Sequence, residues 1–223
     1  MDMYRKIIGN FQIISVISSN DMTTVYLAQH LTLQKKYAVK ALRSRYIKNF
    51  EFYKYFENEA KAQSLLDQHP NIVYVHDFIK DDKIMLLVTE NVEGETLDNI
   101  INKKGKMPEN DAITVFKDIL SGISYAHSKG VIHRNINSSN IFVDKFSHAK
   151  IMDFGISQID KNPDIMREGI TIGTPHYVSP EQITKPKEID HRTDIYALGV
   201  VLYEMLSAQL PFDGDTNFEI YSA

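Results

Sequence analysis

The stretch at residues 131–155, VIHRNINSSNIFVDKFSHAKIMDFG, places two polar clusters between short apolar runs. His133-Arg134-Asn135 comes first, Asn140 follows five residues after Asn135, and Asp153-Phe154-Gly155 closes the stretch. Asn and Asp favour turns, whereas an apolar run such as AKIM favours a strand. The stretch therefore predicts polar side chains that are presented from loops next to short strands.

The composition of the 223-residue chain, with 43% apolar and 24% charged residues, is typical of a globular protein. The formal net charge of −4 is modest, so no basic patch indicates a nucleic-acid partner. Cysteine is absent, which excludes disulfides and thiolate metal sites and fits a reducing compartment. No apolar run approaches the roughly 18 residues of a membrane span, and the N-terminus lacks a signal-peptide core. The sequence thus predicts a cytoplasmic protein without a membrane partner.

The first ninety residues are predicted mostly as strands, in the order β-β-β-α-β-β. Runs rich in β-branched and aromatic residues predict the strands, and helix formers with an apolar stripe predict the helix. The predicted strands are 11–18, 23–30, 35–42, 72–79 and 84–90, and the predicted helix is 51–66.

After Gly94 the pattern changes to helices, predicted at 96–104, 109–128 and 194–207. The last of these is apolar nearly all round except at Asp194 and Glu204, which is typical of a buried helix. A β-rich half followed by a helical half indicates an α+β fold.

The motif series resembles that of the protein kinase family, H-R-D-x-x-x-x-N followed by D-F-G, with Asn135 in place of the Asp. GTPHYVSPEQ (173–182) and HPNIV (69–73) are most similar to bacterial-type (Hanks-type) Ser/Thr kinases. The resemblance implies a two-lobed, protein kinase-like α+β fold over 1–223, with an N-lobe at 1–93 and a C-lobe at 94–223. The family continues with further helices after a segment like 211–214, so we expect a C-terminally truncated C-lobe.

The resemblance also implies a site for ATP. Lys40, in YAVK, matches the lysine that pairs with the α- and β-phosphates, and Glu59 matches its ion-pair partner, with Glu57 as a weaker alternative. Outside the motif series, such a Lys and Glu would simply be solvent-exposed. The other positions that the resemblance assigns to nucleotide binding are Ser18, Asn20, Thr23, Val25, Ala38, Glu90, Val92 and Phe142, and Thr89 takes the gatekeeper position.

Asn140 and Asp153 match the family's two metal ligands. Both are hard oxygen donors of the kind that Mg²⁺ prefers. The alternative is that they are two ordinary turn residues. None of the eight histidines has metal-ligand spacing to another, and we expect His133 to pack within its loop.

The family's phosphate loop, G-x-G-x-x-G-x-V, is replaced here by Ser18-Ser19-Asn20-Asp21-Met22-Thr23-Thr24-Val25, without a glycine. Glycine lets the backbone approach phosphates and adopt positive φ. Asn20 tolerates positive φ better than most residues, but Ser18 and Thr23 add bulk, and Asp21 adds negative charge. The sequence therefore predicts weakened nucleotide binding.

Asn135 stands where the family has the residue that accepts the substrate hydroxyl's proton. An amide oxygen accepts a hydrogen bond but does not take up a proton at neutral pH. Loss of a general base costs about 10²- to 10⁴-fold in rate. Asn137 replaces a lysine that contacts the transferred phosphate, so a positive charge is lost as well.

The resemblance assigns further roles around the activation segment. Thr171 is the best candidate for phosphorylation, with Arg134 as the group that would pair with it, but the favoured interpretation of Thr171 is an unmodified loop residue. Thr174 would bond to the two altered catalytic-loop residues. Asp194 matches the Asp that holds the His-Arg-Asp backbone, and Glu181 would pair with an Arg in the helices that follow in the family.

Three functions remain open from the sequence. The favoured one is a pseudokinase that acts as a regulatory or scaffold module, because Asn135 and the glycine-free loop point the same way independently. The second is a Ser/Thr protein kinase with weak residual phosphotransfer. The third is a truncated, poorly folded relic in which helix 194–207 exposes an apolar patch. A protein partner or substrate is expected, but the sequence does not identify it.

Overall fold

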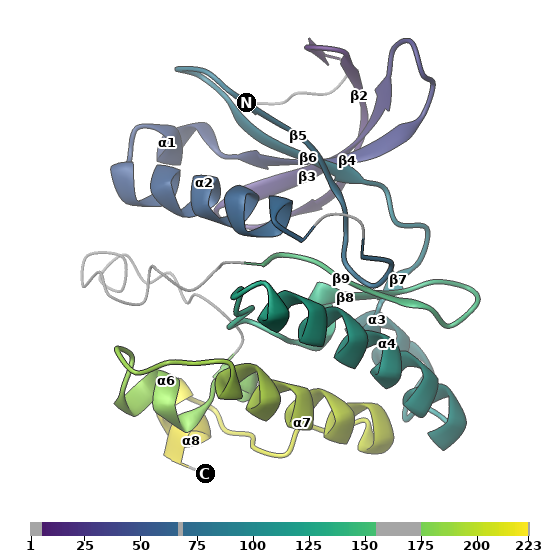
Figure 1. Ribbon diagram of the computed structural model, residues 1–223, viewed down its shortest axis with the longest axis vertical. Coiled ribbons are helices and arrows are strands. Elements are labelled where there is room, and N and C mark those ends of the chain that lie inside the picture. The colour runs from purple at the N-terminus through teal and green to yellow at the C-terminus, as the bar shows by residue number, and fades with distance from the viewer. Residues whose placement is uncertain (1–5, 67–68, 155–174, 223) are drawn as a thin grey trace. The chain divides into compact units, whose positions relative to one another are not determined.

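The computed structural model describes residues 6–66, 69–154 and 175–222 (Figure 1). The chain divides into two compact units. Unit 1 comprises Met1–Asp67 and Val73–Glu93, and unit 2 comprises Gln68–Ile72 and Gly94–Ala223. None of the described helices has the length and hydropathy of a transmembrane span.

Unit 1 is built on an antiparallel six-stranded sheet with the strand order β1-β2-β3-β4-β6-β5. Two helices accompany the sheet, and Asn49 caps the longer one by accepting hydrogen bonds from the N–H groups of Glu51 and Phe52. The strands are β1 (Ile7–Ile8), β2 (Phe11–Ser19), β3 (Thr23–His30), β4 (Lys36–Leu42), β5 (Val75–Lys80) and β6 (Met85–Glu90), and the helices are α1 (Ser44–Ile47) and α2 (Phe50–Ser64).

The register of this sheet separates its residues onto two faces. Val25 lies opposite Lys40, and Ala38 lies opposite both Leu27 and Thr89. Cross-strand partners point to the same side of a sheet, and residues two apart share a face. Four positions that the resemblance singled out, Val25, Ala38, Lys40 and Thr89, therefore share one face. The other face carries a core of Phe11, Ile13, Tyr26, Ala28, Tyr37, Val39, Ala41, Leu86 and Val88.

Unit 2 is mainly helical, and α4 and α7 lie side by side in it (Figure 1). A small three-stranded sheet, in the order β7-β8-β9, belongs to the same unit. The helices are α3 (Leu97–Lys104), α4 (Glu109–Ser128), α6 (Pro180–Thr184), α7 (Arg192–Ser207) and α8 (Asn217–Ser222). The strands are β7 (Glu95–Thr96), β8 (Ile141–Val143) and β9 (Ala149–Ile151), and two 3₁₀ turns are η1 (Ser138–Asn140) and η3 (Pro175–Tyr177).

The predicted strand at 72–79 is wrong at its start, because β5 begins only at Val75. Ile72, the first residue of the predicted strand, belongs to unit 2 instead, where it forms a parallel bridge with Ile151 of β9. Asn71 donates from Nδ2 to the carbonyl of Ala149 at 3.0 Å, and its own carbonyl accepts the N–H of Ile151 at 2.9 Å. Tertiary hydrogen bonds to β9 thus override the local β-propensity of this segment.

The expectation that helix 194–207 is buried holds for one side of the helix only. One side of α7 is buried, but Ile195, Tyr203 and Leu206 on the rest of the helix are 53%, 47% and 43% exposed. Asp194, one of the two polar positions, is instead fully buried. Within the described residues, α7 therefore packs on one side only.

Candidate functional site

The loop that begins at His133 is anchored by the buried carboxylate of Asp194 in the first turn of α7. Its Oδ2 accepts the N–H of His133 at 2.9 Å, and its Oδ1 accepts the N–H of Arg134 at 2.7 Å. His127 Nε2 lies 2.7 Å from the same Oδ2. A negative group at a helix N-terminus is favourable, so one carboxylate stabilises α7 and fixes the loop backbone.

The imidazole of His133 is fully buried and held by two hydrogen bonds. Nε2 lies 3.0 Å from the carbonyl of Met152, and Nδ1 accepts the N–H of Asn135 at 3.3 Å. Its ring centroid lies 4.5 Å from that of Phe154. One nitrogen donates and the other accepts, which defines a neutral ring, and burial lowers the pKa of His133. His133 therefore packs within the loop and connects it to the segment around Phe154.

Two of the motif residues in this unit adopt left-handed backbone conformations, as does Ser147 in the loop before β9. Arg134 and Asp153 both have φ of 63°. Such conformations are uncommon for non-glycine residues and tend to persist where function requires them. The hydrogen bond from the N–H of Arg134 to Asp194 helps to hold the first of the two in place.

The side chain of Asn137 is turned into its own loop. It is 3% exposed, and its Oδ1 accepts hydrogen bonds from the N–H of Ser139 at 3.0 Å and from the Ser139 hydroxyl at 2.5 Å. Its Nδ2 donates to the carbonyl of Asn135 at 3.0 Å and lies 3.4 Å from Asn135 Oδ1. Asn137 is thus the N-cap of η1, and it brings a neutral amide where the family has a charged lysine.

Asn140 and Asp153 are brought into neighbouring segments. The carbonyl of Asn140 accepts the N–H of Met152 at 3.0 Å, and Met152 directly precedes Asp153. Asn140 Nδ2 donates to the carbonyl of Asn135 at 3.0 Å, which leaves Asn140 Oδ1 without a hydrogen-bond partner among the described residues. Mg²⁺ is commonly held by one or two protein oxygens together with substrate phosphates. The two side chains fit that role.

No described part of the chain gathers three or more His, Cys, Asp or Glu side chains into a metal site. A Mg²⁺ ion at Asn140 and Asp153 would therefore need further oxygens from a bound phosphate or from water.

A second anchor, which sequence reasoning missed, joins the loop to α7. Ser138 Oγ lies 3.0 Å from the Tyr177 hydroxyl and 3.2 Å from Glu204 Oε1, and the Tyr177 hydroxyl donates to Glu204 Oε2 at 2.6 Å. Burial raises the pKa values of both Tyr177 and Glu204. The signal in the sequence was Glu204 itself, a lone acid in an otherwise apolar stretch.

In unit 1 the structure pairs Lys40 with Glu59 of α2. Lys40 Nζ lies 2.6 Å from Glu59 Oε1, and the Glu59 side chain is 1% exposed. The alternative, Glu57, contacts Lys80 at 2.7 Å and Lys61 at 3.3 Å. The hydrogen bond from Lys80 lowers the pKa of Glu57. Of the two acids, Glu59 is therefore the partner of Lys40.

The turn that replaces the glycine loop is closed by the side chain of Asn20. Its Oδ1 accepts the N–H of Met22 at 2.9 Å, the N–H of Thr23 at 2.7 Å and the Thr23 hydroxyl at 3.2 Å. Residues 18–25 are all described, and none of them has positive φ. Backbone N–H groups that a glycine loop would offer to phosphates are here bonded within the turn.

Two arginines that sequence reasoning missed hold this turn from outside. Arg43 Nη2 donates to Ser19 Oγ at 2.9 Å, and the Arg43 N–H donates to the Met22 carbonyl at 2.9 Å. Arg45 Nη2 donates to the carbonyl of Asp21 at 2.6 Å and lies near its carboxylate, at 3.9 Å. Asp21 is solvent-exposed, so its charge faces water and Arg45.

The remaining predicted positions are divided between the two units. Glu90 ends β6, where its Oε1 accepts the N–H of Tyr74 at 2.9 Å. Val92 is half-buried after that strand, and Phe142 lies on β8 opposite Thr96 and Lys150. Two further predictions, those for Thr171 and Thr174, lie outside the described residues.

Comparison with known proteins identifies relatives over nearly the whole chain. A family model described as protein kinase domain matches residues 11–223. The chain is 38% identical over 216 residues to serine/threonine-protein kinase PrkC of Bacillus subtilis, covering 97% of this chain and 33% of PrkC. It is 34% identical over 215 residues to serine/threonine-protein kinase PknB of Mycobacterium leprae, covering 94% of this chain and 34% of PknB. The chain thus spans about a third of the length of these relatives, and the predicted two-lobed α+β fold is confirmed.

Proposed function

Because the chain belongs to the protein kinase family, we propose that it is a pseudokinase, a binding module that keeps a weak Mg-ATP site but does not carry out phosphoryl transfer. The observation that carries this proposal is the pair Asn135 and Asn137. Both are neutral amides, and Asn137 is bonded into its own loop. The role of the chain would be regulatory or that of a scaffold for a protein partner.

The retained groups support nucleotide binding. The protein kinase family uses ATP and Mg²⁺. The ion pair between Lys40 and Glu59 keeps an ammonium group in place for phosphates. Asn140 and Asp153 would hold Mg²⁺, which when bound neutralises phosphate charge. The closed turn at 18–25 offers fewer N–H groups, so the proposed affinity is low.

The replaced groups account for the proposed lack of transfer. Asn135 does not accept a proton. Loss of the general base that the family has at this position lowers the reaction rate by about 10²- to 10⁴-fold. Asn137 supplies no positive charge to stabilise a transferring phosphoryl group. Since His133 packs against Phe154, it is not placed to substitute as the base.

The second candidate is a Ser/Thr kinase with weak residual activity. The observation in its favour is that Asp194 still fixes the loop backbone through two hydrogen bonds. Phosphoryl transfer depends mainly on positioning and electrostatics, so an anchored loop without its base would retain a slow reaction.

The nucleotide half of the proposal is tested by thermal unfolding with and without Mg-ATP. At a nucleotide concentration ten times Kd, ligand binding contributes about 1.4 kcal/mol, which raises Tm by about 3–6 °C for a chain of this size. Lys40→Met and Asp153→Ala are expected to abolish the shift. Lys36→Met, which alters an exposed lysine on the same strand, is the matched control.

A shift that survives in both Lys40→Met and Asp153→Ala would contradict the assignment of these residues to nucleotide binding. Absence of a cooperative transition in the unmodified chain would instead support the third alternative, a poorly folded relic.

A further inference from the structure

Unit 1 contains a cavity of about 510 Å³ on the sheet face opposite Lys40. Tyr26, Ala41 and Leu86 line it. Ala41 pairs with Leu86 and follows Lys40 by one residue, so these side chains point away from the lysine. Cavities of about 300–1,000 Å³ are typical of small-molecule sites.

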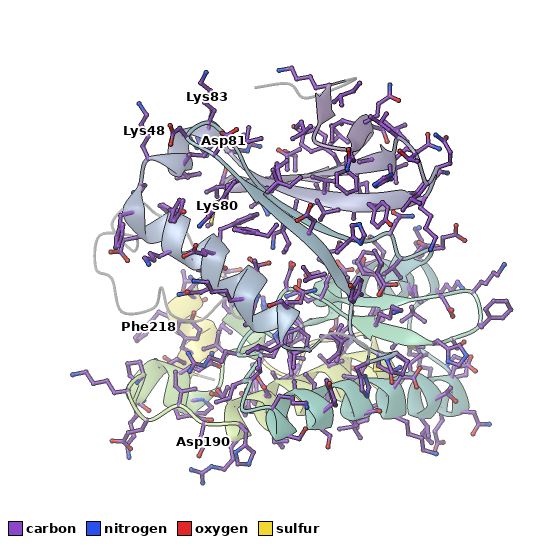
Figure 2. The ribbon with its side chains drawn as sticks, turned by 45° about the horizontal axis from the view of Figure 1, so that its top comes forward. Lys48, Lys80, Asp81, Lys83, Asp190 and Phe218 are labelled. Atoms are coloured by element: carbon purple, nitrogen blue, oxygen red, sulfur yellow. The ribbon has the colours of Figure 1, made fainter. Side chains whose placement is uncertain are left out.

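The cavity combines an apolar floor with a cationic rim. Arg43, Arg45 and Lys83 are its charged lining residues, and no acidic residue lines it among the described ones. Figure 2 shows Lys83 extended from the turn between β5 and β6, at the same end of unit 1 as Lys48. The site therefore presents three positive charges beside an apolar surface.

Arg43 is incompletely satisfied in this position. Its Nη2 donates to Ser19 Oγ at 2.9 Å, but its Nε is buried without a hydrogen-bond partner among the described residues. A buried donor without a partner costs free energy. Guanidinium groups bind phosphate through pairs of parallel hydrogen bonds, so a rotation of the Arg43 side chain toward an anion in the cavity would give the Nε group a partner.

We propose that this cavity binds a small phosphate monoester with an apolar body, in which the phosphate contacts Arg43, Arg45 and Lys83. The apolar body would lie on Tyr26 and Leu86, where it is removed from water. The site is separate from the residues assigned to ATP, because Lys40 points to the other face of the sheet. Binding here does not depend on the proposed function.

A ligand in the cavity would also act on the turn at 18–25. Arg43 and Arg45 donate to Ser19 and to the Asp21 carbonyl in that turn. A phosphate that recruits the same guanidinium groups would compete with these hydrogen bonds. The bound ligand would therefore change the conformation of the turn, and the affinities of the ligand and Mg-ATP would then influence each other.

The proposal is tested by calorimetric titration of the full chain with 1-naphthyl phosphate as the probe. Saturable one-to-one binding is expected, and hexyl phosphate, an aliphatic monoester, is expected to bind as well. Inorganic phosphate and 1-naphthol each lack one half of the probe and are expected to bind at least about tenfold more weakly, which corresponds to one lost interaction of ordinary strength.

Two variants address the two halves of the cavity. Arg43→Gln removes a guanidinium, and Val16→Trp fills the cavity from a half-exposed lining position without changing its charge. Each variant is expected to lower the affinity for the probe at least about tenfold. Lys36→Gln, which removes one exposed charge from the same sheet, and Lys40→Met are expected to leave the affinity unchanged.

Absence of saturable binding, or an affinity unchanged in both Arg43→Gln and Val16→Trp, would overturn the proposal. Loss of binding in Lys40→Met with full retention in Arg43→Gln would also overturn it, because the probe would then occupy the residues assigned to ATP. None of these outcomes depends on whether Mg-ATP raises Tm.

Discussion

The turn at 18–25 and the loop at 133–140 have both lost residues that the protein kinase family uses, and both close on themselves through an asparagine. In the turn, Asn20 accepts two backbone N–H groups, and in the loop, Asn137 caps η1. Their surroundings differ. Asn20 is exposed, whereas Asn137 is 3% exposed in a loop that is tied to α7.

This difference means that the two regions respond differently to mutation. The turn at 18–25 is a surface feature held by Arg43 and Arg45, so its residues can change at small cost to the fold. The loop at 133–140 is part of the packed interior of unit 2. A substitution that restores a missing chemical group there also disturbs hydrogen bonds on which stability depends.

The largest expected effect is at the anchor of the buried loop. Asp194→Asn replaces an oxygen that accepts a backbone N–H with an NH₂ group, which places two donors against each other. We expect a loss of about 3–5 kcal/mol in the free energy of unfolding, as for a broken buried ionic network. Urea denaturation measures the change.

Asp190→Asn is the matched control, because Asp190 lies on the surface next to the same helix and pairs with Arg192. Exposed ion pairs contribute little, so this variant is expected to unfold like the parent. Equal losses in the two variants would show that Asp194 is not a special anchor.

The next largest effect is expected when Asn137 and Asn20 are each replaced by alanine and compared. Asn137→Ala removes the cap of η1 and the bond to the Asn135 carbonyl, with an expected loss of about 1–2 kcal/mol. Asn20→Ala, in the exposed turn, is expected to cost less than half as much. Urea denaturation of both variants decides the point, and a larger loss at Asn20 would reverse the comparison.

The smallest effect is a pH dependence that arises in the buried loop. Burial lowers the pKa of His133 in the folded chain, whereas histidine in an unfolded chain titrates near about 6.5. Below that pH the unfolded state binds a proton that the folded state does not, so the free energy of unfolding falls as pH decreases, by at most about 1.4 kcal/mol per unit.

Stability curves between pH 7.5 and pH 5, in roughly the range where histidine titrates, measure this slope. His133→Gln is expected to reduce the slope. An unaltered slope in His133→Gln would exclude His133 as its source.

The sequence predicted those elements whose pattern is local. The helix at 109–128 has its observed bounds because its apolar residues recur at helical spacing. The predicted start of β5 was wrong because Asn71 and Ile72 belong to unit 2. They contact β9, which is far away in the sequence.

One contact was predicted where a motif specifies it. The motif series led to Lys40 and Glu59, which the structure pairs, although the spacing alone left Glu57 open. The sequence did not predict two sets of contacts, those of Ser138 with Tyr177 and Glu204 and those of Arg43 with the turn. They depend on which side chains meet in the folded chain, and no local pattern encodes that.

We propose that the chain lacks phosphoryl transfer because Asn135 does not act as a base. Transfer from radiolabelled Mg-ATP, to the chain itself and to a generic protein substrate, tests this most directly in the parent, Asn135→Asp and Asp153→Ala. Asn135→Asp is the preferred variant, because residue 135 receives its neighbours' hydrogen bonds mainly through its backbone carbonyl.

We predict that the parent transfers no more phosphate than Asp153→Ala, and that Asn135→Asp raises the rate by about 10²-fold or more. Adding Asn137→Lys would raise it further only if the stability lost at the buried position is tolerated. Transfer by the parent that is well above the Asp153→Ala background, and not raised in Asn135→Asp, would contradict this proposal and identify an active kinase.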